Sequence, residues 1–162
     1  MIFLEHVHPD LAFQMTRIGA LGIIVWNGVP PNDRVFEEHC HVSKAWVREH
    51  GPFGVFLNVA GSFVPSAAQR QIVAAYREDM GIAHIPRIAI LTDSTLARSA
   101  MLVLTWLARS RSVETRGFRP GEIATALAWL EQVAPGAVDV EKALAAVKRA
   151  EKRFAASQSA AI

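Results

Sequence analysis

The sequence lacks the features that define several classes of protein. It has a single cysteine, Cys40, among 162 residues, which excludes an internal disulfide framework and suits a reducing compartment. No apolar run approaches the roughly 20 residues that a transmembrane helix needs. Residues 1–6 carry neither the basic region nor the cleavage site of a signal peptide. We therefore expect a cytoplasmic protein without a membrane span.

Motifs for common catalytic and metal-binding sites are also missing. There is no G-x-S-x-G, no Walker sequence and no G-x-G-x-x-G, so the hydrolase, nucleotidase and Rossmann interpretations lack their defining loops. His6 and His8 share one face of a predicted strand, but two imidazoles alone make an incomplete metal site. We expect no metal and no cofactor.

Cys40 lies between His39 and His41 on a predicted helix. A catalytic thiol needs a base within hydrogen-bond reach and a lowered pKa, and a position in the middle of a helix argues against both. The weakest hypothesis is an enzyme that uses Asp93 or His84 at strand ends. We expect no catalytic residue.

Charge of either sign is modest, since 17 Lys and Arg face 15 Asp and Glu, for a net charge of +2. Bulk electrostatics therefore do not indicate nucleic-acid binding, and we expect none. The later half is the more basic one, through Arg109, Arg111, Arg116, Arg119, Lys142, Lys148, Arg149, Lys152 and Arg153. These residues form either a solvated face or a patch for an acidic partner or phosphate.

What the sequence does have is a repeated pattern of apolar strands and amphipathic helices. At residues 87–92 a short apolar run ends abruptly at Thr92-Asp93-Ser94-Thr95, and a helix-periodic run follows. This pattern is typical of a buried strand that passes into a capped helix. Further strands are predicted at residues 3–7, 12–17, 21–26, 53–59 and 113–116.

Helices are predicted between these strands. Asn32 or Asp33 caps the first, which stops at His50-Gly51-Pro52, and Pro65-Ser66 opens the second. Apolar residues at both parities of residues 21–26 indicate a strand that is covered on both faces. The order predicts an α/β domain at residues 1–135, with a mainly parallel sheet of four or five strands and an N-terminal antiparallel hairpin.

Residues 136–162 are predicted to form a C-terminal amphipathic helix and a frayed tail. Its narrow apolar stripe consists of Val140, Leu144, Val147 and Phe154. A stripe of this width docks either on its own domain or on a second subunit. The stripe is therefore our candidate for an oligomerisation surface, and we expect a homodimer.

Two local sequences near the end of the domain carry a resemblance to a known family. Residues 113–119 read Val-Glu-Thr-Arg-Gly-Phe-Arg, and residues 126–130 read Ala-Leu-Ala-Trp-Leu. With the opening hairpin and the strand at residues 87–92, the chain resembles the SpoIIAA-like superfamily, which includes STAS domains and anti-sigma-factor antagonists. The resemblance implies helices packed largely on one side of the sheet. It also implies a non-enzymatic role in binding a protein partner, a nucleotide-bearing regulator or an apolar ligand.

In the antagonist branch of that superfamily, a serine at the start of the second helix is phosphorylated and switches partner binding. Residues 65–68 read Pro-Ser-Ala-Ala here, where that branch has Asp-Ser-Ser/Thr-Gly. Ser66 therefore stays, but the aspartate and the glycine do not. The candidate surface for a partner or switch is Asn58, Gly61, Ser62 and Ser66.

Ligands collect outside the carboxyl ends of strands in sheets of this kind. Polar residues at those ends, namely Asn27, Asp93 and Ser94, could form one rim with that surface, or they are ordinary caps and turn residues. Trp46, Trp106 and Trp129 have inward helical positions and are predicted to be core residues. If a cavity exists, they would line it, and a small apolar ligand between helices and sheet is the alternative function.

Overall fold

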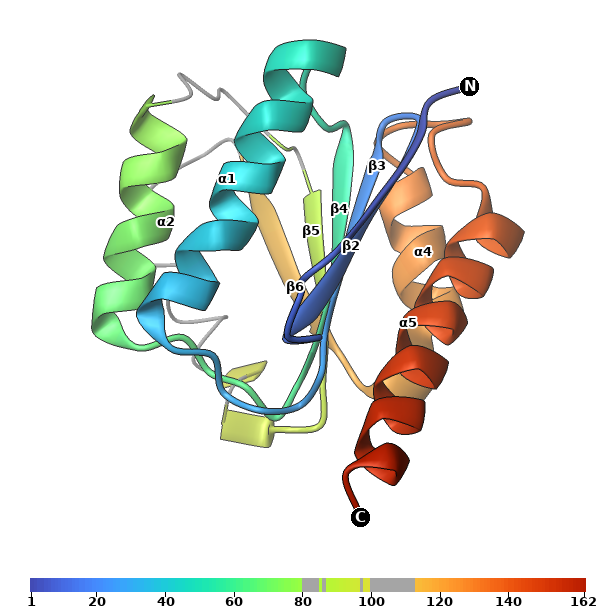
Figure 1. Ribbon diagram of the computed structural model, residues 1–162. Helices are drawn as coiled ribbons and strands as arrows, with labels where there is room; N and C mark the ends of the chain where they lie inside the picture. Colours follow the sequence, from blue (N-terminus) through green and yellow to red (C-terminus); the bar gives the residue numbers. More distant parts are fainter. Residues whose placement is uncertain (80–84, 86, 97, 100–112) are drawn as a thin grey trace.

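The computed structural model describes residues 1–79, 85, 87–96, 98–99 and 113–162. One sheet lies between two layers of helices (Figure 1). Its strands are β1 (Phe3–Val7), β2 (Phe13–Ile18), β3 (Leu21–Trp26), β4 (Val55–Gly61), β5 (Arg87–Thr92) and β6 (Glu114–Phe118). The helices are α1 (Asp33–His50), α2 (Ala67–Asp79), α4 (Ile123–Glu131) and α5 (Val140–Ala160), with a 3₁₀ turn at Pro120–Glu122.

The six strands lie in the order in which they occur in the chain. β1, β2 and β3 pair antiparallel, and β3, β4, β5 and β6 pair parallel. The predicted α/β class is therefore confirmed, with an antiparallel hairpin at one edge of a mainly parallel sheet. The part of the sheet that the structure describes has six strands, because both strands of the hairpin join it.

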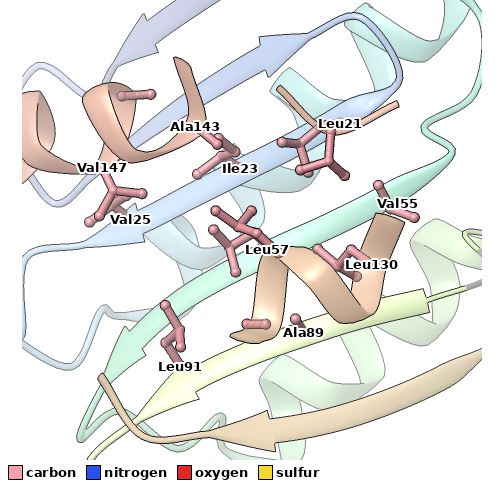
Figure 2. Packing of buried hydrophobic residues seen from close by; sticks show 14 of the residues in the cluster. Leu21, Ile23, Val25, Val55, Leu57, Ala89, Leu91, Leu130, Ala143 and Val147 are labelled. Carbon is pink, nitrogen blue, oxygen red and sulfur yellow. The ribbon is translucent and has the colours of Figure 1, made fainter. Parts of the chain in front are cut away.

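Both faces of the sheet are covered. Leu21, Ile23 and Val25 of β3 pack with α4 and α5 (Figure 2), whereas Ile24 and Trp26 of the same strand pack with α1 and α2. The alternating residues of a strand point to opposite faces, so a strand that is apolar at both parities needs a helical layer on each side. The implied packing of helices largely on one side is therefore wrong for this chain.

The local signals at α1 and β4 have clear structural counterparts. Asn32 caps α1, because its Oδ1 accepts a hydrogen bond of 2.9 Å from the Val35 N–H. Gly51 follows the helix with a φ of 81°, a conformation that glycine adopts at little cost. β4 begins two residues later than predicted and continues two residues further, to Gly61. Asn58, expected near the carboxyl end of the strand, therefore lies in its middle.

Helix α5 is docked on its own chain. Val147 and Phe154 are buried in the same core as the sheet and α4, and Leu144 packs against that core. Only Val140 of the stripe is largely solvent-exposed, at 40%. The buried side chains of the stripe are therefore not a free surface for a second subunit.

Some predicted residues lie outside the described ones: His84, Trp106, Arg109, Arg111 and most of the helix expected after Thr95. Leu96, an apolar residue at the start of that helix, is 76% exposed. Trp129 is buried and Trp46 packs against the core on the α1 face, as predicted. Among the described helices, none has the length and apolar character to cross a membrane.

A buried cation ties the antiparallel strands to α1 and to the start of β4. Arg17 on β2 is only 2% exposed, and its guanidinium lies 4.7 Å from the centre of the Phe53 ring. It donates hydrogen bonds to the backbone carbonyls of Gly19, Trp46, His50, Gly51 and Pro52, at 2.7 to 3.3 Å. The last carbonyls of a helix have no partner within it and carry partial negative charge, so Arg17 caps the end of α1.

We predict that Arg17→Met destabilises the protein by about 3 kcal/mol, because several buried carbonyls lose their donor at once. The measurement is urea unfolding followed by circular dichroism. Arg34→Met is the matched control, since Arg34 is exposed and makes a surface pair with Glu38. Its expected loss is about 0.5 kcal/mol or less. Equal losses in the two variants would contradict the role of Arg17.

Candidate functional site

The carboxyl ends of β3, β4 and β5 lie side by side, because these strands are parallel neighbours. The segments that follow them lead into α1, into α2 and into the helical turn at residues 95–96, at the lower end of the sheet in Figure 1. We call this edge the carboxyl-end rim. It is where ligands and partners meet sheets of this architecture.

Two of the loops at the rim are joined by hydrogen bonds. The carbonyl of Gly61 accepts from the Asp93 N–H at 3.2 Å and from the hydroxyl of Thr92. That hydroxyl in turn accepts from the Ser94 N–H at 3.2 Å. The structure thus brings Gly61, Asp93 and Ser94 together, while the Asp93 side chain stays exposed. Thr92 at the end of β5 is the residue that joins them.

Asn27 and Ser66 serve as local caps at the rim. The Oδ1 of Asn27 accepts from the Val29 N–H at 2.9 Å. The Oγ of Ser66 accepts from the Gln69 N–H at 3.1 Å, and the Gln69 side chain accepts from the Ser66 N–H at 3.0 Å. This reciprocal pair is a capping box at the start of α2. The same Gln69 donates to the Pro31 carbonyl at 2.9 Å, which holds the start of α2 against the loop before α1.

Asn58 does not lie on the rim. It is within β4, opposite Ile24 and Ile90, and the alternation of the strand turns it toward the face that α1 and α2 cover. Its Oδ1 is buried and has no hydrogen-bond partner among the described residues. The candidate surface therefore keeps Gly61, Ser62 and Ser66 and loses Asn58.

The rim also has an apolar part that the sequence interpretation missed. Val29, Val64 and Leu96 are 60%, 44% and 76% exposed. They lie in the segments after β3, β4 and β5, so neighbouring strand ends present all three at one edge. We call these three residues the apolar trio. An apolar residue inside a polar turn was the available signal, but only the strand order shows that the three lie on neighbouring loops at one edge.

A histidine–carboxylate pair lies where the β1–β2 turn meets α1. His8 is 3% exposed, and its Nε2 is 2.6 Å from Glu38 Oε2. The Asp10 N–H donates to His8 Nδ1 at 3.1 Å, so the ring proton lies on Nε2, which donates a hydrogen bond to the Glu38 carboxylate. The pair holds the turn against the helix. The described residues contain no group of three or more His, Cys, Asp or Glu side chains that could bind a metal ion.

His39 and Cys40 form a close contact, with 3.7 Å between His39 Nε2 and Cys40 Sγ. Burial lowers the pKa of His39 to about 4, and its Nδ1 is bonded to the Phe36 carbonyl. A base with so low a pKa cannot take the proton of an ordinary thiol, whose pKa is about 8.5. The contact is therefore packing inside an aromatic cluster with Trp26 and Phe36.

A groove of about 260 Å³ lies between α1 and α2. Its lining includes Cys40, Ile72 and Tyr76, and an ion pair between Lys44 and Asp79 spans the two helices beside them. Pockets for ligands of drug size range from about 300 to 1,000 Å³, so this groove is small for an apolar ligand. Trp46 and Trp129, which we expected to line any cavity, do not line it.

The basic residues of the later half that the structure describes do not form one free patch. Arg149 and Arg153 pair with Glu5, and Lys142 pairs with Asp139. Arg116 and Arg119 are exposed at β6 and just after it, far along the sheet from α5. Several of the predicted cations are thus engaged in surface pairs within the chain.

The comparison with known families agrees with this architecture. The sequence model of the SpoIIAA-like family matches residues 26–131, from the last residue of β3 to the last residue of α4. The chain belongs to the SpoIIAA-like family, whose domain is of the STAS type and suggests a regulatory module that acts through protein contacts. β1, β2 and α5 lie outside the match. No curated protein and no solved structure matches the chain significantly.

The environment of His39 generates a pH prediction. Its pKa falls from 6.5 to about 4 on folding, so the unfolded state binds more protons in that window. The contribution of His39 to the free energy of unfolding is therefore fully present above about pH 6.5, and it decreases as the pH falls toward 4. Between pH 7 and pH 5 we expect a loss of about 2 kcal/mol, measured by urea unfolding at both pH values.

The control for this prediction is His39→Gln, which removes the titrating ring. Its loss of stability between the same pH values should be clearly smaller. Burial and the neighbouring His8 also lower the pKa of His6, which leaves some residual dependence of the same sign. An unchanged dependence in His39→Gln would show that His39 titrates normally in the folded protein.

Proposed function

We propose that the chain is a non-catalytic regulatory module of the SpoIIAA type that binds a protein partner through its carboxyl-end rim. The observation that carries the proposal is the apolar trio of Val29, Val64 and Leu96, three exposed apolar side chains from three neighbouring loops. Single exposed apolar residues are ordinary on a protein surface. Their convergence on one edge is the feature that favours an interaction surface.

Polar groups surround the apolar trio in the manner of a protein interface. Ser62, Ser66 and Asp93 are exposed on the same loops. A protein interface commonly has an apolar centre enclosed by a polar border that stays partly solvated. The rim matches this composition, and its loops are held rigidly by the Thr92–Gly61 and Gln69–Pro31 hydrogen bonds. A rigid surface loses little conformational entropy when a partner binds.

A non-catalytic role is supported by the state of the polar side chains near the rim. The hydroxyls of Ser66 and Thr92 are engaged as caps, and His8 is held between Glu38 and the backbone of Asp10. The hydroxyls of Ser66 and Thr92 bond to backbone groups and not to the general base that acyl-transfer chemistry would need. This arrangement of side chains therefore suits binding to the surface of a partner protein better than it suits catalysis.

Ser66 is the position at which charge would control the rim. Its side chain is exposed and lies two residues from Val64. A phosphate there adds close to two negative charges beside an apolar contact and at a helix N-terminus. Such a change would repel a partner that covers the trio, and the helix start itself would tolerate the charge.

Substitutions in the rim test the proposal. Val64→Asp should weaken capture of partners from a host lysate about tenfold, because a charge would be buried at the centre of the contact. Ser66→Asp should act in the same direction and still cap α2, since aspartate is a good N-cap. The measurement is quantitative mass spectrometry of the captured proteins, followed by binding titration with the main one.

Two control variants isolate the surface from the fold. Val133→Asp introduces the same charge at a residue that is 41% exposed but lies after α4, away from the rim. Ser66→Asn keeps the cap without adding charge. Both controls should bind as the unmodified protein does. Equal capture by Val64→Asp and Val133→Asp would remove the rim from the interaction.

The alternative proposal, a small apolar ligand, would place that ligand in the groove between α1 and α2. Its support is weaker because the groove is about 260 Å³ and the Lys44–Asp79 pair spans the helices there. Native mass spectrometry of protein purified from its host would separate the two proposals. We expect the unliganded mass, and a bound small molecule that Ala75→Trp displaces would favour the ligand instead.

A further inference from the structure

We propose that β1 pairs antiparallel with β1 of a second copy of this chain, so that two six-stranded sheets join into one. This surface is separate from the carboxyl-end rim and does not depend on it. It also differs from the stripe on α5, whose buried members pack inside their own chain. The argument depends on the outer edge of β1, on its side chains and on the charges beside it.

The outer edge of β1 has unpaired backbone groups. β1 ends the order of strands and pairs only with β2 within the described sheet. The backbone N–H of Gly19 donates to the Ile2 carbonyl at 2.8 Å, and the backbone N–H of His8 donates to the Phe13 carbonyl at 3.0 Å. Hydrogen-bonded pairs alternate in an antiparallel ladder, so the even-numbered residues of β1 face β2. The N–H and C=O groups of Phe3, Glu5 and Val7 therefore point away from the sheet.

The side chains of β1 do not protect this edge. Natural edge strands commonly carry lysine, proline or a bulge that prevents pairing. β6, at the opposite edge, has exposed Glu114 and Arg116. β1 has the sequence Phe-Leu-Glu-His-Val and a regular register, and Phe3 is 51% exposed. Its one charged residue, Glu5, is turned toward α5, where arginines hold it.

A second copy fits this edge because the strand is complementary to itself. With a two-fold axis at Glu5, Phe3 of each copy lies opposite Val7 of the other. Such apolar cross-strand pairs stabilise a sheet. The outward-facing backbone groups of Phe3, Glu5 and Val7 then meet the same groups of the second copy with the correct alternation. A two-fold arrangement is also the commonest symmetry of protein dimers.

The charges beside β1 favour a second copy over an unrelated strand. Arg149 and Arg153 lie 3.5 and 3.4 Å from the carboxylate oxygens of Glu5, and Arg149 also lies 5.7 Å from the Phe3 ring centre. Two cations thus face one carboxylate in each copy. A guanidinium has five N–H donors, so the arginines can also bind the Glu5 of the second copy. This compensates for two carboxylates that face each other across the axis.

The interface is small, so the dimer is weak. Five residues of strand and the side chains next to it bury less surface than the roughly 1,200 to 2,000 Å² of a stable complex. The fraction of protein in the dimer therefore depends on protein concentration and rises as the concentration approaches the dissociation constant. Its elements, β1 and α5, lie outside the residues that match the family. The pairing therefore uses elements that the family match does not include.

Analytical ultracentrifugation of the full chain tests the proposal between about 5 and 500 µM, the range of a weak complex. We expect the dimer fraction to increase with concentration. Phe3→Lys should raise the dissociation constant at least about tenfold, because like charges then flank the axis. Val133→Lys, the same substitution at a similarly exposed residue, should leave it unchanged. Neither should alter partner capture at the rim, so the two proposals can fail separately.

Amide hydrogen exchange of the unmodified protein gives a second result that needs no variant. The amides of Phe3, Glu5 and Val7 should become protected as the dimer forms, while those of β6 should not change. A monomer at the highest concentration would overturn the proposal. A dimer in which these three amides exchange freely would also overturn it, as would protection that arises only when a different protein is added.

Discussion

The hydrogen bonds of Arg17 are the interaction on which the arrangement of the sheet depends. A guanidinium buried without a carboxylate partner among the described residues would be costly, but five backbone carbonyls around the end of α1 satisfy it. The antiparallel part of the sheet is thereby joined to the first parallel crossover. Arg87 has a similar role at β5, where it donates to the Trp129 carbonyl near the end of α4 at 2.5 Å. In both places an arginine on a strand caps the helix that packs beside it.

These joints position the surfaces to which we assign function. Arg17 and Arg87 hold the carboxyl ends of α1 and α4 at one end of the sheet. The loops of the rim lie at the other end, where the parallel strands finish. Those loops are short and held by side chains such as Thr92 and Gln69, so the apolar trio is presented on a rigid edge. The antiparallel hairpin at the other side leaves β1 as a terminal strand. The rim and the edge of β1 are thus separate consequences of one topology.

Much of the fold could be predicted because its signals are local. Asn32, Gly51 and Ser66 fix helix ends through bonds to residues close to them in the chain. Less of the site could be predicted. Gly61, Asp93 and Ser94 do come together, but Asn58 was misplaced by a strand that continues two residues further. The trio was missed, because exposure of Val29 or Leu96 depends on what packs above them and has no signature in the local pattern.

The sequence by itself determined the strands, the helices, their caps and the need for apolar cover on both faces of β3. Each of these follows from periodicity or from a hydrogen bond within a few residues. Only the tertiary structure decided that α5 docks on its own sheet, that Arg17 is buried, and that the three apolar loop residues meet at one edge. These outcomes depend on contacts between residues far apart in the chain, such as Arg17 with Gly51 and Arg153 with Glu5. The local sequence pattern does not predict these contacts, because the same periodicity is compatible with packing against several different elements.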